Sequence, residues 1–564
     1  MVREIVNRPT FAALMRGEGI RLLSVPFPRW IAVAQLVLAA VAAAVIASII
    51  PITPSNPEAT LEIIARLFEL VAWIAILCTT LACGNAIGGE ITSGAIRAAI
   101  LAAPRRGRLL CAKSVVLFLT ALLSAAATTT GSLAIALPVL AAREAPITWS
   151  FAIPIAIAAV GLCTSIATIG LIAFATTIVF RSAAGAVLVV LAVVFIAPSV
   201  TAMLANELDA PWLSGALPSV AAHALIMPAL VDGPWRALDG TMPSSVPWHG
   251  AVVLTAWLAL SLLGAGRALA GPIDIARSSP PRSLARGTGD GRAPVGTEWI
   301  KLRTLPSTRW IAAGTIAVLV GYGAFRAIAV DLEEVASDLE LASRIEYVYA
   351  ITAGIGLAQL VLGGLAATSV TAEHRFGTIR TTLAATPRRT IVSLRKVAAV
   401  AGATAVIALA GLALSWGVVS IIRAIRGTAL GITWPLGLAS VACGTAYLVL
   451  VALLALGIGG LVRHAAGAVT ALVALLVVLP SLFNVVLAFA RGTPAVWIGN
   501  LGAFLPWAGE RAYMDVLLGL EGRVFGFAQD GALSLPPAIG GLVLLAWVAL
   551  ALAAWIATFE RRAV

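Results

Sequence analysis

The sequence predicts an all-α polytopic membrane protein, with twelve transmembrane helices arranged as two parallel six-helix repeats. Three observations lead to this fold class. First, 60% of the 564 residues are hydrophobic, 11% are charged and the mean hydropathy is +1.01, which is more apolar surface than a soluble core could bury. Second, apolar runs long enough to cross a membrane recur along the chain. Third, a basic, proline-containing motif occurs once in each half.

The apolar runs of about 20 residues, the length that crosses a hydrocarbon core, number six in each half. The expected spans of the first half are 31–50, 64–88, 114–141, 151–180, 183–204 and 249–270. Those of the second half are 310–330, 347–371, 397–422, 434–461, 465–489 and 537–558. Because Met1 to Arg29 is basic and no small-residue cleavage site follows the first run, we expect that run to be an uncleaved signal anchor.

The repeated motif reads "EITSGAIRAAILAAPRRGRLLCAKS" from Glu90 and "EHRFGTIRTTLAATPRRTIVSLRKV" from Glu373. The two copies share their charged, glycine and proline positions in register. Two further blocks match in the same way: "EGIRLLSVPFPRWIA" from Glu18 with "EWIKLRTLPSTRWIA" from Glu298, and "RSAAGAV" from Arg181 with "RHAAGAV" from Arg463. Chance similarity between alanine-rich helices would not keep charges and prolines in register over three blocks, so the chain contains an internal duplication.

A segment rich in Pro, Gly, Ser and Arg separates the halves. It predicts a flexible cytoplasmic linker over 271–297, between a first domain at 1–270 and a second at 298–564, with a reach of roughly 30 Å. An even number of spans before the linker makes the repeats parallel. Most Lys and Arg residues then fall on the side of the N-terminus, and the acidic stretch "DLEEVASDLE" from Asp331 falls on the other side. The positive-inside rule therefore predicts cytoplasmic N- and C-termini.

Each motif copy lies on the predicted cytoplasmic side, between the second and third spans of its half. If it is helical, Glu90, Gly94 and Arg97 share one face, and that face is expected to be exposed. Pro104 would stop the helix, and Arg105 with Arg106 would anchor it at headgroup depth. A loop that only obeys the positive-inside rule would explain the arginines equally well. It would not explain why the acidic residues Glu90 and Glu373 occur in an otherwise basic loop. Contact with a partner protein would explain them.

These features resemble the ABC transporter permeases of the second type, an exporter family common in actinobacteria. The resemblance rests on an amphipathic helix ending in Arg-Trp, six spans per half and the Glu-x-x-x-Gly-x-Ile-Arg motif ending in Pro-Arg-Arg. It implies an entry helix at 10–29 and coupling helices at 89–104 and 372–387. The residues implied to contact the ATPase are Glu90, Gly94, Arg97, Pro104, Arg105, Arg106, Glu373, Gly377, Arg380, Pro387, Arg388 and Arg389. Many members have six spans and dimerise, whereas this chain resembles two such permeases fused.

The resemblance implies a bacterial cytoplasmic membrane location and two copies of a separate ATPase subunit, which would bind ATP and Mg²⁺. This chain is expected to bind no cofactor and to catalyse nothing itself. A Walker A loop needs a Gly-Lys-Ser/Thr sequence, and none of the three lysines, Lys113, Lys301 and Lys396, follows a glycine. The net charge of +12 arises from basic residues that fall mostly on the predicted cytoplasmic side of the membrane. The expected partners of these residues are therefore membrane lipids and not nucleic acid.

The cargo path is implied to follow the second and fifth spans of each half, which are mostly Ala, Val, Leu and Ile. Such a path suits a hydrophobic or amphipathic cargo, namely an antibiotic or other drug, a peptide or a lipid, with drug or antibiotic efflux (multidrug resistance) favoured. Candidate path residues are Arg66, Glu69, Trp73, Phe195, Tyr347 and Tyr349. Arg66 and Glu69 could equally pair with each other at the interface, and the tyrosines could be interfacial anchors.

Two other functions remain open from the sequence. An ion-coupled secondary transporter with twelve spans would need acidic or basic groups at mid-membrane, and none lies deeper than Glu69. An intramembrane enzyme would need a Ser/His, paired Asp or metal constellation in the spans, and none is evident. Five scattered cysteines without a CxxC spacing and four scattered histidines predict no metal site.

Overall fold

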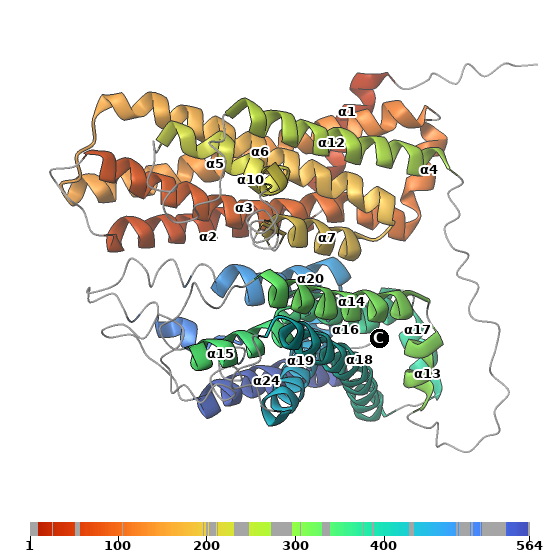
Figure 1. Ribbon diagram of the computed structural model, residues 1–564. Helices are drawn as coiled ribbons and strands as arrows, with labels where there is room; N and C mark the ends of the chain where they lie inside the picture. The colour runs from red at the N-terminus through yellow and green to blue at the C-terminus, as the bar shows by residue number, and fades with distance from the viewer. Residues whose placement is uncertain are drawn as a thin grey trace, which may run out of the picture. The chain divides into compact units, whose positions relative to one another are not determined.

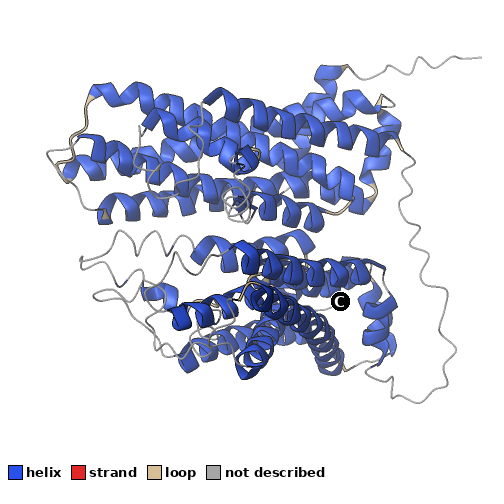
Figure 2. Ribbon diagram, viewed as in Figure 1, coloured by secondary structure: helices blue, strands red, loops and turns tan. Residues whose placement is uncertain are grey.

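The chain divides into two units, Met1–Arg286 and Gly287–Val564, and the boundary lies inside the predicted linker. All regular structure that the computed structural model describes is helical (Figures 1 and 2). The described residues are 10–24, 26–50, 57–103, 105–195, 197–198, 201, 210, 212–230, 247–271, 296–304, 306–329, 339–375, 377–385, 388–427, 434–480, 483, 497, 500–507, 509 and 537–561. Most of the linker, Pro104 and Pro387 therefore lie outside the described residues.

The first unit begins with a short helix followed by a long apolar one, and two short helices precede its last span. Its helices are α1 (Phe11–Ser24), α2 (Pro26–Ile49), α3 (Pro57–Ser93), α4 (Ala95–Ala102), α5 (Arg106–Ala142), η1 (Trp149–Phe151), α6 (Ala152–Phe180), α7 (Ala183–Phe195), α9 (Trp212–Gly215), α10 (Pro218–Leu230) and α12 (Pro247–Ala270).

The second unit follows the same order, with one long helix divided in two. Its helices are α13 (Gly296–Thr304), α14 (Pro306–Ala329), α15 (Leu339–Thr352), α16 (Ile355–Arg375), α17 (Thr378–Ala385), α18 (Arg389–Ile425), α19 (Trp434–Val462), α20 (Ala465–Val473), the π-helix η2 (Ala474–Val478), η3 (Leu501–Phe504) and α24 (Pro537–Arg561). Corresponding helices have equal lengths: α2 and α14 have 24 residues, α5 and α18 have 37, and α6 and α19 have 29.

Nine helices within the described residues are long and apolar enough to cross a membrane. The chain is thus an all-α, membrane-embedded protein. The nine coincide with expected spans, and the other three expected spans are 64–88, 183–204 and 465–489. The first of these lies within α3, and α7 and α20 cover the beginnings of the others. The full number of twelve stays a prediction, and α10 is a shorter apolar helix that lies outside the twelve expected spans.

Each unit is packed around one central helix, which is α6 in the first unit and α19 in the second. In the first unit α6 contacts α3, α5 and α12, and in the second α19 contacts α16, α18 and α24. Small residues permit this close approach, since a Cβ on Gly459 of α19 would lie 2.9 Å from the carbonyl oxygen of Ala367 on α16. The result is a tight bundle in each unit, whose helix ends carry the charged residues.

The helices expected over 89–104 and 372–387 are each interrupted. Residues 89–93 continue α3, and α4 begins only after Gly94, whose φ is 76°. In the second unit α16 runs through Glu373 to Arg375, and Gly377, with φ of 67°, precedes α17. A left-handed glycine ends a helix because it has no Cβ to clash. The expected entry helix over 10–29 is likewise two helices, because α2 starts at Pro26, a residue suited to the first turn.

Candidate functional site

The candidate site lies at the junction of α3, α4 and α5 in the first unit and at the matching junction of α16, α17 and α18 in the second. The helix that precedes the first span, α1 or α13, joins each junction through its charged residues. Figure 1 places α1 and α4 at one end of the first unit, and α13 and α17 at one end of the second. Four charged side chains meet at each junction, and they come from helices far apart in sequence.

In the first unit, Lys113 at the start of α5 bridges two carboxylates. Its Nζ donates to Glu18 Oε1 of α1 at 2.6 Å and to Glu90 Oε1 of α3 at 2.7 Å. Arg21 of α1 pairs with both acids, and its Nε donates to Glu18 Oε2 at 2.9 Å. Arg21 also donates to the carbonyl oxygen of Ala86 at 3.2 Å. Two acids and two bases make this first ion cluster neutral.

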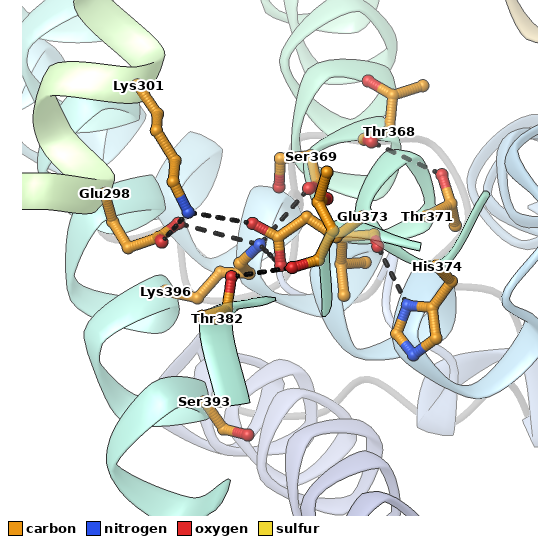
Figure 3. A network of polar contacts seen from close by, with 12 residues as sticks. Glu298, Lys301, Thr368, Ser369, Thr371, Glu373, His374, Thr382, Ser393 and Lys396 are labelled. Carbon is orange, nitrogen blue, oxygen red and sulfur yellow. Dashed lines mark hydrogen bonds and ion pairs between the residues drawn. The ribbon is translucent and has the colours of Figure 1, made fainter. Parts of the chain in front are cut away.

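The second unit repeats the arrangement with matching residues, as Figure 3 shows. Lys396 Nζ of α18 lies 2.7 Å from Glu373 Oε2 of α16 and 3.7 Å from Glu298 Oε2 of α13. Lys301 takes the place of Arg21 and pairs with Glu298 and, at 3.3 Å, with Glu373. Lys396 also donates to the carbonyl oxygen of Ser369 at 3.3 Å. The second ion cluster is therefore neutral as well.

This arrangement corrects the expectation that Glu90 and Glu373 lie on an exposed face. Glu90 is 6% exposed and Glu373 is 9% exposed, and each belongs to the end of a long helix instead of the short one that follows. The physical reason is charge: a carboxylate can be buried where cations from other helices surround it. These glutamates hold the helices of the junction together from within.

Lys301, the exposed member of the second ion cluster, is held in its charged form by its glutamate partners. Burial by itself lowers the pKa of Lys301, but the hydrogen bond to Glu298 and the negative charge of Glu373 outweigh it and raise that pKa above its ordinary value. A raised lysine pKa means that the ion pairs contribute fully below the pKa of the unfolded chain. That contribution is lost only as pH rises through the folded-state pKa, in the alkaline range.

The short helices α4 and α17 are amphipathic and present arginines outward. Ile96 and Ile379 are buried against their units, while Arg97 and Arg380 are exposed. Arg105 and Arg388, at the N-caps of α5 and α18, are also exposed. Gly94 and Gly377 connect these helices to the spans before them. The exposed basic groups of each junction therefore include Arg97 and Arg105 in one unit and Arg380 and Arg388 in the other.

Arg106 and Arg389 have a structural contact within their own units. Arg106 donates to the carbonyl groups at the end of α12 and just after it, including those of Ala270 and Gly271 at 3.1 Å. Arg389 donates to the carbonyl oxygen of Phe559 at the end of α24 at 2.8 Å. Helix carbonyls without a partner carry partial negative charge, so an arginine is favourable there. These two arginines connect the third span of each half to its last helix.

The candidate path residues fall into three groups. Trp73 of α3 and Phe195 of α7 pack edge to face with ring centroids 5.4 Å apart, so the second and fifth expected spans of the first half meet there. Arg66 forms ion pairs with Glu69 and Glu62. Tyr347 is buried, and its hydroxyl lies 2.9 Å from Ser420 Oγ and accepts from Trp416 Nε1. The side chain of Arg326 lies over the ring of Tyr349.

Sequence reasoning missed Glu18 and Glu298 as partners of the motif glutamates. Two signals could have found them. The block that begins at each of these acids is duplicated, and all three lysines of the chain fall in the two clusters. It also missed Arg423, a buried arginine in α18 that is absent from the duplicated motifs.

No group of three or more His, Cys, Asp or Glu side chains that could hold a metal ion occurs within the part of the chain that the structure describes. No protein-family model matches the sequence, and no curated protein is significantly similar to it.

Proposed function

We propose that this chain is the membrane subunit of an ATP-driven exporter, which carries a hydrophobic or amphipathic compound such as an antibiotic, a peptide or a lipid. ATP would be hydrolysed by a separate subunit bound in two copies, one at α4 and one at α17. The observation that carries the proposal is the pair of matching junctions. Each presents a short amphipathic helix with an outward arginine, connected to a buried ion cluster that joins three helices.

Such a junction suits a docking element for mechanical reasons. A partner that moves α4 would also move the ends of α3 and α5, because Gly94 joins α4 directly to α3 and Lys113 links α5 to Glu90 and Glu18. Because charge-assisted contacts are strong, the helices whose side chains they connect move together. A loop needed only for orientation would gain nothing from a neutral buried cluster, since the positive-inside rule counts cations alone.

The first experiment is charge reversal of the exposed arginines, Arg97→Glu with Arg380→Glu. Neither side chain is buried, so the double variant should fold as the parent does. If they face an acidic partner surface, copurification of the ATPase should fall by about tenfold or more, corresponding to ~1.4 kcal/mol. The measurement is the amount of ATPase recovered with the solubilised chain from its native host, identified by mass spectrometry.

The matched control is Arg29→Glu with Arg309→Glu. These exposed arginines begin α2 and α14 on the same predicted side of the membrane, and their reversal changes the net charge equally. The control should keep the ATPase bound. Unchanged recovery in the α4 and α17 variant would contradict docking there. Recovery of the chain without any ATPase, with transport driven by an ion gradient alone, would favour the secondary transporter.

A further inference from the structure

We propose that Arg326, Arg423 and Arg426 form a binding site for a phosphate group at the end of the second unit opposite its ion cluster. The key observation is Arg423 of α18, which is 1% exposed. Its Nε, Nη1 and Nη2 atoms find no hydrogen-bond acceptor within the described structure. A buried guanidinium without an acceptor is among the most expensive groups a fold can contain.

The surroundings of Arg423 are strongly positive. The charges that act on it are those of Glu346, Arg426 and Arg326. Glu346 is already used by Arg326, whose Nε and Nη2 donate to its two carboxylate oxygens at 3.2 and 3.0 Å. Three arginines and one glutamate leave a net charge of +2, and Arg423 is the one of these three arginines that has no hydrogen-bond acceptor within the described structure.

Helix capping does not account for Arg423. An arginine near a helix C-terminus is often explained by its bonds to the last carbonyl groups. Arg426 does this, donating to the carbonyl groups of Ala327 and Ile328 at the end of α14. Its counterpart Arg143, in the first unit, donates to those of Ala47 and Ile50. Arg423 makes no such bond.

The internal duplication shows that the fold does not require these charges. Counted from the first residues of α5 and α18, Leu140 occupies the position of Arg423. The corresponding comparison of α2 with α14 pairs Ile46 with Arg326, and the register that aligns Glu90 with Glu373 pairs Ile63 with Glu346. Leu140, Ile46 and Ile63 are all buried. One half therefore fills this position with three aliphatic side chains, and the other places charges there.

A phosphate group fits this chemistry best. Guanidinium forks bind anionic oxygens bidentately, and a phosphate can serve several forks at once, whereas a carboxylate offers two oxygens. The site lies about 40 Å from the second ion cluster, because Arg423 and Lys396 are at opposite ends of α18, which rises ~1.5 Å per residue. This is the thickness of a bilayer with its headgroups. Arg326 and Arg426 are partly or fully exposed, so the cluster is accessible to a lipid headgroup or to a soluble phosphate compound.

The test measures thermal unfolding of the full chain in lipid nanodiscs. One set of nanodiscs contains only the uncharged, phosphate-free lipid digalactosyldiacylglycerol, a second also contains phosphatidylglycerol, and a third is the first set with added inorganic phosphate. The parent protein should unfold at a higher temperature in the second set, the third set or both. Stabilisation by phosphatidylglycerol alone assigns the site to a lipid headgroup, and stabilisation by inorganic phosphate assigns it to a soluble compound.

Arg423→Leu should abolish this stabilisation, and it should fold because Leu140 occupies the same position in the first unit. Arg423→Lys keeps the charge without the fork and should retain part of the effect. The control Arg143→Gln removes one charge from the equivalent end of the first unit and should leave the stabilisation unchanged.

Two results would overturn the proposal. One is an equal response to phosphatidylglycerol and phosphate in Arg423→Leu and the parent. The other is a parent protein that responds to neither.

Discussion

At the scale of single residues, the two ion clusters show how burial decides what a charge contributes. Lys396 and Lys301 belong to the same cluster and contact the same two glutamates, yet the Lys396 side chain is 5% exposed and that of Lys301 is 49% exposed. A buried ion pair is costly to break, because removal of one partner leaves an uncompensated charge. An exposed pair contributes little, because water screens it.

Lys396→Met should therefore destabilise the protein far more than Lys301→Met. The expected losses are about 3–5 kcal/mol for the first and less than about 1 kcal/mol for the second. Thermal unfolding in detergent measures both. Adding Glu373→Gln and Glu298→Gln to Lys396→Met should restore part of the stability, since no buried acid then lacks its cation. Equal losses for the two lysine variants would show that burial does not control the cluster.

At the scale of elements, one glycine in each half ends a long helix and starts a short one. Gly94 and Gly377 have φ values of 76° and 67°, and a Cβ on either would meet no atom within 4 Å. The glycines are needed for backbone conformation and not for space. The direction of α4 relative to α3, and of α17 relative to α16, depends on this one dihedral angle.

Gly94→Ala and Gly377→Ala should each cost about 1–2 kcal/mol, the price of a left-handed conformation for a residue with a Cβ. The same substitution at Gly131, inside α5 with equally open surroundings, should be neutral or stabilise by up to about 1 kcal/mol. Denaturant titration followed by circular dichroism compares the three. If the Gly131 variant loses as much as the other two, the effect is not due to the dihedral angle.

At the scale of the whole molecule, two units of one design differ in the charges they carry. Both have an ion cluster at the end next to the short helix. The second unit alone has Arg326, Glu346 and Arg423 at the opposite end, where the first has isoleucine and leucine. The two halves are therefore expected to bind the same kind of partner at their short helices and to differ in what they bind elsewhere.

If each half binds one ATPase copy, as proposed, the single variants Arg97→Glu and Arg380→Glu should each reduce the ATPase recovered from two copies per chain to one. The double variant should lose both. Native mass spectrometry of the purified complex counts the copies. Loss of both copies in either single variant would mean that the ATPase binds only as a preformed dimer held by both helices together.

Much of the helical layout could be predicted from the sequence. A single apolar run that crosses a membrane can pair its backbone N–H and C=O groups within itself only as a helix. Expected spans such as 114–141 and 434–461 coincide with α5 and α19. Helix ends were less predictable. The motif from Glu90 predicts one helix because Glu90, Gly94 and Arg97 have helical spacing. The pattern of side chains did not reveal that Gly94 adopts a left-handed conformation.

By itself, the sequence determined that this is an all-helical membrane protein with an internal duplication, since composition, run length and repeated charges are local properties. Only the tertiary structure decided where the charges lie. Glu90 is buried because Arg21 and Lys113, which are distant in the chain, meet it in space. Arg423 is buried without a hydrogen-bond acceptor among the described residues because of the helices packed around it. The energy of a charge depends on its neighbours in three dimensions, and neither residue type nor spacing contains that information.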